Sequence, residues 1–518
     1  MGTTKLLVNA TVVTMERARP VAQAVAIRDG RIAAVGSEEE LSRQQAGAEV
    51  VDLGGATVIP GFVDPHNHFA VAALERFWAD CRTPPLKTIP EVQAALRVAA
   101  GRAPEGAWVR GWGYHHARLA ERRHPTRYDL DEAVPDRPAL LMHFSYHQCV
   151  VNSRALAAAG VSRGTQDPAG GEIGRDRSGE PTGLLFERAM GLAERASREG
   201  WEARFGEGAA AASRRYASQG ITTVQDAAVG AATERRYVEA EGAGQLTIRV
   251  ERMAVNDSGW FDAPGSVVGV REGTGVLKLF VDGGYRCAMR LRREGREATS
   301  GFLFYRPGDL ADLLVVAWRA GWRVTCHAIG NWGVEVAVEA VEQAMRREPG
   351  GRGRVRIDHA VFLTRDLVRR IRTLEVFVVT QPNFVYDLGG RNARLPSSML
   401  YLPFGSLLRA GVPLAFSSDY PCGSLGPLMG ICAAVTRESP GGHGGDPDEA
   451  ISVQAALEAY TIGAARAAGL GEECGSVEAG KRADLVVLEA NPLEVPPERL
   501  PGLRVFKTLV VGREVWPS

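Results

Sequence analysis

The sequence predicts an α/β protein, a (β/α)8 TIM-like barrel with a small β-sandwich domain built from both chain ends and a large insertion after the first barrel strand. Eight β-rich segments alternate with helical patterns in the middle of the chain, and further β segments lie at both ends. Far more chain separates the first two barrel strands than any other pair. We therefore expect a composite β-sandwich domain from 1–57 and 475–518, a barrel over 58–474, and an inserted subdomain at about 70–217.

The β segments at the two ends of the chain share one character. Segments 6–13 and 25–35 near the start, and 483–488 and 505–511 near the end, are short and rich in Val, Leu and Ile. Little helical pattern separates them from the middle of the chain. Because the termini of a domain often lie close together, we expect both ends to form one small β domain.

The middle of the chain alternates strand and helix patterns, as a wound barrel requires. Helical segments with apolar residues three or four positions apart include 309–320, 334–347 and 363–374. A chain of 518 residues exceeds the size of one compact core, so an accessory domain beside the barrel is expected. A long insertion in a barrel loop, such as that at about 70–217, usually covers the functional site. The eight candidate strands are 57–63, 221–225, 246–253, 276–281, 323–326, 355–357, 376–380 and 412–416.

The composition argues against several classes of function. Lys and Arg total 61, as do Asp and Glu, so a formal net charge of zero predicts neither a nucleic-acid nor a membrane-surface partner. No apolar run approaches the roughly 20 residues that a bilayer span needs. The seven cysteines are scattered and form no CxxC pair, which favours a reducing cytoplasm. We expect a cytoplasmic protein with a small-molecule substrate, and leave the oligomeric state open, with a homodimer as one option.

Residues with metal-binding chemistry follow the candidate barrel strands. His66 and His68 stand two apart at the end of the first strand, a spacing that points both imidazoles to one side. This pair alone is weak evidence, but His327 and His359 end two later strands and Asp419 follows the eighth. Catalytic groups of barrel enzymes lie at the C-terminal strand ends, and imidazoles and carboxylates bind divalent metals. The pattern therefore predicts a metal centre.

A lysine inside an apolar strand adds to this pattern. Only five of the 61 basic residues are lysines, and Lys278 lies within the apolar strand 276–281, where an unpaired ammonium is costly. A lysine amine can lose its proton and react with carbon dioxide to give a carbamate that bridges two metals, which a guanidinium cannot do. The alternative is an ordinary lysine that extends to solvent or pairs with a carboxylate such as Asp282.

The same residues lie in longer motifs that resemble the amidohydrolase superfamily. The likeness is strongest to the branch called amidohydrolase family 3 (YtcJ-like), which includes N-substituted formamide deformylases, and it extends over nearly the whole chain. The motifs that carry it are 60–68 (PGFVDPHNH), 220–226 (GITTVQD), 278–283 (KLFVDG), 327–330 (HAIG), 356–359 (RIDH), 381–384 (QPNF), 417–421 (SSDYP) and 480–485 (GKRADL).

The resemblance implies a fold, a metal site and a reaction. It implies a barrel enzyme that hydrolyses a C–N bond in an amide, N-formyl or cyclic amide, with one or two divalent ions, zinc being the expected metal. The implied site comprises His66 and His68 on one metal, His327 and His359 on a second, a carboxylated Lys278 between them, and Asp419 as ligand and proton shuttle. Such a metal lowers the pKa of a bound water to about 7.

The sequence also departs from the branch at positions near the implied ligands. Asn331 follows the HAIG motif where the branch usually has Asp, and Asp358 precedes His359 where the branch usually has Glu. Neither residue is an implied metal ligand. The departures therefore concern the substrate and the groups that orient the ligands.

Candidate substrate contacts come from the insertion and from the barrel. His147 and Trp112 from the insertion, together with Asp282 and Gln381 from the barrel motifs, are the candidates. Aromatic residues of a packed subdomain are more often part of its core than of a binding wall. Two other functions stay open: a one-metal or ester- and lactone-cleaving hydrolase on the same site, and an inactive metal-binding regulatory protein.

Overall fold

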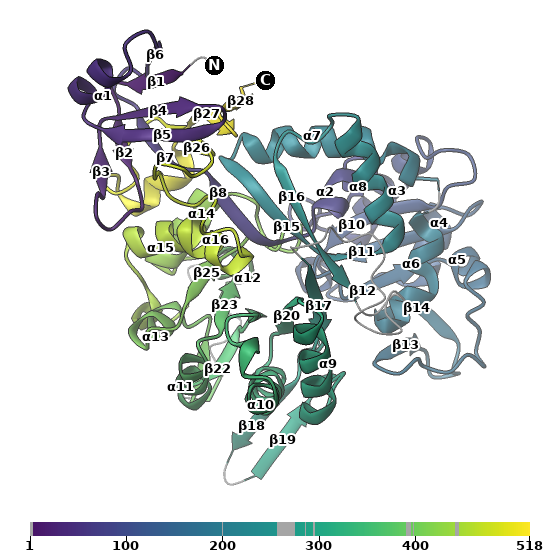
Figure 1. Cartoon of the computed structure of the whole chain (residues 1–518). Helices are drawn as coiled ribbons and strands as arrows, with labels where there is room; N and C mark the ends of the chain where they lie inside the picture. The colour runs from purple at the N-terminus through teal and green to yellow at the C-terminus, as the bar shows by residue number, and fades with distance from the viewer. Residues whose placement is uncertain are drawn as a thin grey trace.

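The computed structural model of the chain describes residues 4–198, 200–255, 275–284, 286–293, 296–389, 395–396, 398–440 and 445–517. Its centre is an eight-stranded parallel sheet that curls into a nearly closed barrel (Figure 1), as predicted. The strands pair in the order in which they follow one another along the chain. They are β8 (Phe62–Asn67), β15 (Ile221–Val229), β16 (Arg249–Val255), β17 (Val276–Phe280), β20 (Arg323–Ala328), β21 (Val355–His359), β23 (Phe377–Thr380) and β25 (Leu414–Phe416).

Two backbone hydrogen bonds join the first strand of the barrel to the chain that follows the last. The Asp419 N–H donates to the carbonyl of His66 at 3.0 Å, and the His68 N–H donates to the carbonyl of Tyr420 at 2.9 Å. The barrel is therefore drawn together at its C-terminal rim. This brings residues that are about 350 positions apart in the sequence into direct contact.

Helices follow the barrel strands and bury one apolar stripe each. In α10 (Asn331–Arg347) the side chains of Val334, Ala337, Val338 and Val341 recur at three- and four-residue spacing and are fully buried. The predicted helical segments 309–320 and 334–347 correspond to α9 and α10. The third predicted segment, 363–374, corresponds to α11, which begins two residues later because Phe362–Thr364 forms the short strand β22. Other barrel-side helices and strands are α8 (Ala231–Gly242), α9 (Pro307–Arg319), α11 (Arg365–Leu374), α12 (Asn383–Leu388), α13 (Phe404–Arg409), α14 (Pro427–Thr436), α15 (Val453–Tyr460), α16 (Ile462–Ala468), β18 (Met289–Arg293), β19 (Arg296–Ser300) and β24 (Met399–Tyr401).

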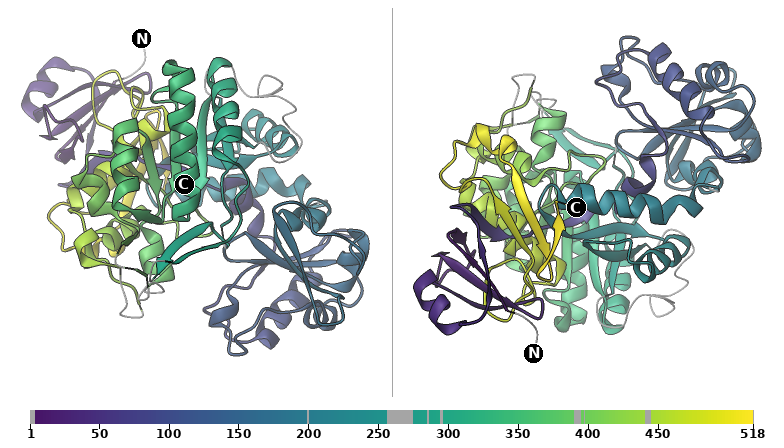
Figure 2. Two further views of the ribbon diagram at one scale, coloured as in Figure 1. Left: turned by 90° about the horizontal axis from the view of Figure 1, so that it is seen from below. Right: turned by 90° about the horizontal axis from the view of Figure 1, so that it is seen from above.

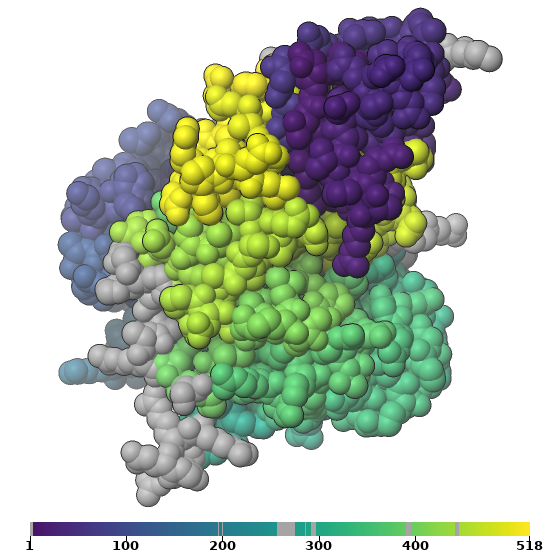
Figure 3. Space-filling model, turned by 90° about the vertical axis from the view of Figure 1, so that its left-hand side faces the viewer, coloured from purple at the N-terminus to yellow at the C-terminus, as the bar shows by residue number. Residues whose placement is uncertain are grey.

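Two sheets lie beside the barrel, one built from N-terminal strands alone and one from strands of both chain ends, and they lie together in Figure 3 as purple and yellow atoms. Side chains from the two sheets, among them Val25, Val58 and Leu485, share one buried cluster. The first sheet holds β5 (Arg31–Gly36), β4 (Ala24–Arg28), β1 (Lys5–Val8) and β6 (Glu49–Asp52), with helix α1 (Glu38–Gln44). The second holds β28 (Arg513–Trp516), β27 (Val505–Val510), β26 (Leu485–Leu488), β7 (Thr57–Pro60), β2 (Thr11–Val13) and β3 (Val21–Ala22).

The predicted first barrel strand, 57–63, is in fact two strands. Strand β7 pairs with β26 in the terminal sheet, and β8 starts the barrel after a break at Gly61. A Cβ on Gly61 would lie 2.3 Å from the side chain of Thr222, so only glycine lets the chain pass there. The apolar pattern runs through this break without a change, which is why the sequence suggested one strand.

The insertion forms a separate lobe that stands beside the barrel in both views of Figure 2. Helices α2 (Phe69–Glu75) and α7 (Phe205–Ala217) pack on each other where the chain leaves and re-enters the barrel. The lobe contains one six-stranded sheet with the strand order β13 (Gly171–Arg175), β14 (Pro181–Glu187), β12 (Gln148–Val151), β11 (Ala139–His143), β10 (Val109–Tyr114) and β9 (Ala79–Asp80). Its helices are α3 (Ile89–Ala100), α4 (Arg127–Ala133), α5 (Ser153–Ala158) and α6 (Gly191–Arg198). Among the described residues, no helix has the length and apolar character to cross a membrane.

Candidate metal centre

The six ligand candidates meet in one cavity of about 960 Å3 at the C-terminal rim of the barrel. Each sits where its strand ends or faces the barrel interior, because side chains alternate along a strand and the strand ends of a barrel converge. The residues that the structure brings together are His66, His68, Lys278, His327, His359 and Asp419.

Short distances connect these side chains across the barrel. The Nε2 atoms of His66 and His68 lie 3.3 Å and 3.2 Å from Oδ1 of Asp419. The ring centre of His359 lies 4.6 Å from that of His66 and 4.4 Å from that of His327. Ligand atoms of His66, His359 and Asp419 all lie within 4.8 Å of one another, a spacing that one metal ion can bridge.

The chemistry of the histidines fits a metal. Within the described part of the chain, the buried Nε2 atoms of His327 and His359 make no hydrogen bond. Such orphaned atoms are costly unless a ligand satisfies them. Burial lowers the pKa of His359 to about 3, and burial also lowers the pKa of His327 well below its usual value. Both imidazoles are therefore neutral, which is the form that binds metal.

One carboxylate that was not a candidate organises the deepest part of the site. Oδ2 of Asp358 lies 2.6 Å from Nδ1 of His66 and accepts a 2.9 Å hydrogen bond from Nζ of Lys278. Its Oδ1 accepts from Nε of Arg356 at 2.9 Å. This arrangement holds the His66 ring so that its Nε2 points toward Asp419. Lys278 is thus fully buried and paired with Asp358, whereas the alternative to a carbamate had named Asp282 as an example of a partner.

The electrostatics of the carboxylates follow from these contacts. Burial alone would raise the pKa of Asp358, but the cations of Arg356 and Lys278 outweigh it and hold that pKa well below its usual value. The pKa of Asp419 is likewise held low against its burial, by the neighbouring His66 and His68. Both carboxylates are therefore ionised, and Asp419 offers a charged oxygen to a ligand.

The backbone around the ligands is locally strained. Both Asp419 and His359 adopt positive φ angles, of 53° and 78°, in a region that non-glycine residues rarely occupy. Strain of about 1–3 kcal/mol at such positions persists only where the surrounding structure enforces it, and it clusters at functional sites. Hydrogen bonds from Ser418 to Asp64, including its N–H to Oδ1 at 3.0 Å, hold the loop after β25 in place.

The four tentative substrate contacts have different positions. His147 lines the cavity, with Nδ1 2.8 Å from Oε2 of Glu187. Oε1 of Gln381 accepts a hydrogen bond from Nδ1–H of His359 at 3.0 Å, so Gln381 orients that ring. Gln381 itself is not among the residues that line the cavity, and neither are the remaining two candidates, Asp282 and Trp112.

Asp282 and Trp112 are held by other parts of the fold. Asp282 is fully buried and accepts the N–H groups of Ile329 and Gly330 at 2.9 Å and 2.8 Å, at the start of α10. Trp112 lies buried in β10 of the inserted lobe, with the Arg82 guanidinium over its ring. Oδ1 of Asp282 still lies 3.7 Å from Nε2 of His327, so Asp282 is next to a ligand candidate, whereas Trp112 belongs to the sheet of the inserted lobe.

Much of the cavity lining is apolar, a feature that the sequence did not reveal. Loops of the inserted lobe and of the barrel both contribute to it, so residues far apart in the chain face one another. Its large apolar side chains are Phe144, Tyr146, Met190, Leu192, Phe280, Phe304, Ile329, Val361, Phe362, Phe384, Leu388 and Tyr401.

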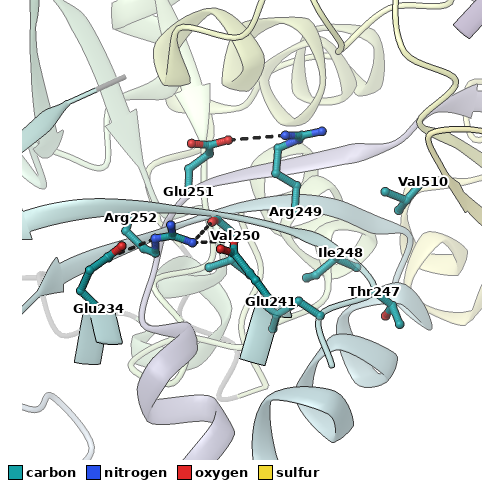
Figure 4. A pocket seen from close by; sticks show the side chains of 10 residues that line it. Glu234, Glu241, Thr247, Ile248, Arg249, Val250, Glu251, Arg252 and Val510 are labelled. Atoms are coloured by element: carbon teal, nitrogen blue, oxygen red, sulfur yellow. Dashed lines mark hydrogen bonds and ion pairs between the residues drawn. The ribbon is translucent and has the colours of Figure 1, made fainter. Parts of the chain in front are cut away.

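A second hollow, between α8, β16 and β27, has a different character (Figure 4). Its charged side chains point at one another. Arg252 pairs with Glu234 at 3.1 Å and with Glu241 at 2.6 Å, and Arg249 lies 3.8 Å from Glu251. These charges are already matched, so the cavity at the barrel rim is the better candidate for chemistry.

Comparison with known proteins agrees with this site. The model of a family described as the amidohydrolase family matches residues 49–516. The chain belongs to the amidohydrolase family. A shorter match, to the bacterial imidazolonepropionase-like composite domain, covers residues 24–48 of this amidohydrolase, within the terminal sheets.

Individual relatives match almost the whole amidohydrolase. It is 36% identical over 530 residues to the N-substituted formamide deformylase of Arthrobacter pascens, covering 98% of this chain and 97% of the relative. It is 30% identical to the Bacillus subtilis protein YtcJ, named an amidohydrolase, over 95% and 96% of the two chains. The crystal structure of an uncharacterized metal-dependent hydrolase from Pyrococcus furiosus matches with a TM-score of 0.73 and 26% identity, over 95% of this chain and 100% of the other.

These likenesses confirm the predicted family and the predicted type of reaction. The protein is a metal-dependent hydrolase of the amidohydrolase family that acts on C–N bonds. The six ligand candidates found from the sequence are among the residues that line its cavity.

Proposed function

We propose that this amidohydrolase cleaves the C–N bond of an amide, N-formyl amine or cyclic amide that carries an apolar substituent. The observation that carries the proposal is the lining of the cavity, which combines histidines and carboxylates, here called the floor, with many aromatic and aliphatic side chains, here called the wall. The floor suits the polar reacting group, and the wall removes the apolar part of the substrate from water. The deformylase activity of the Arthrobacter pascens relative is consistent with a small acyl group at the floor.

The floor would hold one or two divalent ions, with zinc as the expected metal. His66 and His68 would hold one ion and His327 and His359 the other, with Asp419 as a further ligand. Neutral imidazoles and an ionised carboxylate are the ligands that zinc prefers. A divalent ion held there supplies Lewis acidity, which makes water a nucleophile near neutral pH and polarises a substrate carbonyl.

Lys278 would complete the site as an N6-carboxylated side chain. Its Nζ lies 3.4 Å from Nδ1 of His66 and faces the same cavity as the histidines. A carbamate there would add two oxygens between the two groups of ligands and would replace a buried cation by an anion. The alternative is a one-metal site in which Lys278 keeps its ion pair with Asp358.

Two further groups would handle the substrate and its protons. Asp419 stands beside the histidines with its carboxylate ionised, so it can take a proton from the attacking water and pass it to the leaving nitrogen. His147, oriented by Glu187, lies beside His327 with 5.4 Å between the ring centres, and would donate a hydrogen bond to the substrate carbonyl.

We also propose the organisation of the protein around this reaction. Residues 1–57 and 475–518 would form one β-sandwich domain, although β7 extends it by a few residues, to Pro60. The insertion at about 70–217 would act as the cover of the site, because it supplies His147 and part of the apolar wall. A small molecule in the cytoplasm is the proposed substrate.

Metal analysis together with a hydrolysis screen tests this proposal. The purified protein should contain stoichiometric transition metal and should cleave N-formyl or N-acyl amines with benzyl-sized substituents faster than those with methyl groups. Asp419→Asn should lose almost all activity, because the proton shuttle is gone, and should retain metal. A metal-free protein with full activity would overturn the proposal.

Two more measurements decide between the alternatives. An intact mass that exceeds the sequence mass by one carbon dioxide, absent in Lys278→Ala, would support the carbamate. One metal per chain in fully active protein would favour the one-metal site. Lactones belong in the screen, and faster cleavage of lactones than of the matched lactams would replace the amide by an ester as the proposed substrate.

A further inference from the structure

The residue that follows Asp419, Tyr420, is held by two polar side chains. Tyr420 is 4% exposed, and its hydroxyl donates a hydrogen bond to Oε1 of Glu75. Nη1 of Arg215 donates to the same hydroxyl at 2.6 Å and to Oε1 of Glu75 at 3.1 Å. The hydroxyl, the carboxylate and the guanidinium therefore form a closed triangle in which each group contacts the other two.

The two partners of Tyr420 come from the helices that connect the barrel to the inserted lobe. Glu75 is the last residue of α2, where the chain leaves the barrel, and Arg215 lies in α7, where the chain returns. The Arg215 guanidinium also lies over the Tyr420 ring, 4.6 Å from its centre, and the ring of Tyr216 meets it edge-on at 6.2 Å. These contacts fix the ring of Tyr420 as well as its hydroxyl.

The main chain of Tyr420 connects this fixed side chain to the ligand candidates. Its carbonyl accepts the N–H of His68 at 2.9 Å, and the N–H of Asp419 donates to the carbonyl of His66 at 3.0 Å. Between these two bonds, Asp419 has a φ of 53°, a conformation that persists only where the surroundings enforce it. Oδ1 of Asp419 lies 3.3 Å and 3.2 Å from the Nε2 atoms of His66 and His68, so a small backbone rotation would break this arrangement.

We propose that Tyr420 is a positioning residue, whose anchor on Glu75 and Arg215 holds the Asp419 carboxylate in the place that proton transfer requires. The inference rests on the proposed role of Asp419 as proton shuttle. Tyr420 is not among the residues that line the cavity, so it acts through Asp419 and not on the substrate. Because both partners lie on the connecting helices, the same anchor links the catalytic carboxylate to the base of the inserted lobe.

Tyr420→Phe tests the anchor, because it removes the hydroxyl and keeps the ring and the main chain. A displacement of about 1 Å at the reacting groups can cost about 100-fold in rate, so kcat for an N-formyl or N-acyl amine should fall by about 10- to 100-fold. KM and zinc content should stay at the wild-type values, because the apolar wall and the four histidines are unchanged. A loss of stability alone would not divide kcat from KM in this way.

The matched control is Tyr114→Phe. Tyr114 is a fully buried tyrosine of the inserted lobe whose hydroxyl lies 3.0 Å from Nδ1 of His124. This variant also removes a buried, hydrogen-bonded hydroxyl, but it lies outside the catalytic cavity and should keep the wild-type kcat.

Two variants of Glu75 separate the hydrogen bond from other effects. Oε2 of Glu75 makes no hydrogen bond within the described part of the chain, so Oε1 alone forms the anchor. Glu75→Gln keeps an oxygen that can accept from Tyr420 and Arg215, and should retain most of the wild-type kcat. Glu75→Ala should lose as much as Tyr420→Phe, and the double variant should lose no more than either single one, because all three break one anchor. Wild-type kcat in Tyr420→Phe and Glu75→Ala, or losses that multiply in the double variant, would overturn the proposal.

Crystal structures of the metal-free wild type and Tyr420→Phe test the anchor without a substrate. In the variant, the Asp419 carboxylate should lie farther from His66 and His68 than in the wild type. An unmoved Asp419 would overturn the proposal, and Glu75→Ala takes the place of Tyr420→Phe if that variant fails to fold. A displaced Asp419 in the variant of a protein that cleaves no amide would overturn the proposed reaction and leave the anchor standing.

Discussion

Replacement of Asp358 by asparagine separates the orienting role of this carboxylate from that of the metal ligands. As an ionised carboxylate, Asp358 only accepts hydrogen bonds, and three donors converge on it from His66, Lys278 and Arg356. Asparagine has nearly the same shape but offers one oxygen and one NH2 group. Whichever way the amide turns, its NH2 group faces at least one of these donors.

The expected losses concern metal binding and stability separately. His66 loses its fixed ring orientation, and removal of such a partner typically lowers metal affinity by about 10- to 100-fold. In the metal-free protein, Lys278 and Arg356 lose their shared buried counter-charge, and breaking a buried ion pair from one side costs about 3–5 kcal/mol. Asp358→Asn should therefore bind zinc more weakly and unfold at lower urea concentration.

Competition with a chromogenic chelator measures the zinc affinity, and urea unfolding of the stripped protein measures the stability. Asp484→Asn is the matched control, since Asp484 is also a buried carboxylate but lies in the terminal domain and accepts the N–H of Val511 at 2.7 Å. An amide oxygen can keep that bond, so zinc affinity should not change. Unchanged zinc affinity in Asp358→Asn would refute the role assigned to this carboxylate.

Two other predictions concern the cavity wall and the pH dependence of stability. A Cβ on Gly284 would lie 2.0 Å from the His147 ring, so Gly284→Ala should displace that ring. We expect kcat/KM to fall by about 10- to 100-fold while the metal content stays unchanged. Gly242→Ala is the control and should have no effect, because there is open space around Gly242. Wild-type kcat/KM in Gly284→Ala would show that the position of His147 does not matter. Burial raises the pKa of Glu75 from 4.5 to about 7. The carboxyl group of Glu75 therefore holds its proton more tightly in the folded protein than in the unfolded chain. As the pH rises from about 4.5 to about 7, the folded protein loses up to about 3 kcal/mol of stability. Urea unfolding of Glu75→Gln at about pH 5 and about pH 8 should show a smaller pH dependence than the wild type, and an unchanged difference would contradict this.

The sequence was most informative where a feature is local. Apolar runs located seven of the eight barrel strands and the start of the first, and the histidines and Asp419 lie at or shortly after the strand ends. The break at Gly61 was missed, because it depends on how closely Thr222 approaches the chain. Likewise, the partner of Lys278 is Asp358, from a strand 80 residues later, and not the nearby Asp282.

The sequence by itself predicted the barrel and the residues of the candidate metal centre, because strand periodicity and residue chemistry are properties of short segments, and its resemblance to a known family predicted the type of reaction. Only the tertiary structure decided which side chains orient the ligands, which residues form the apolar wall, and that Tyr420 meets Glu75 and Arg215. These features depend on the direction of side chains and on contacts between segments far apart in the chain. Such contacts are set by the packing of the whole fold, which no local pattern encodes.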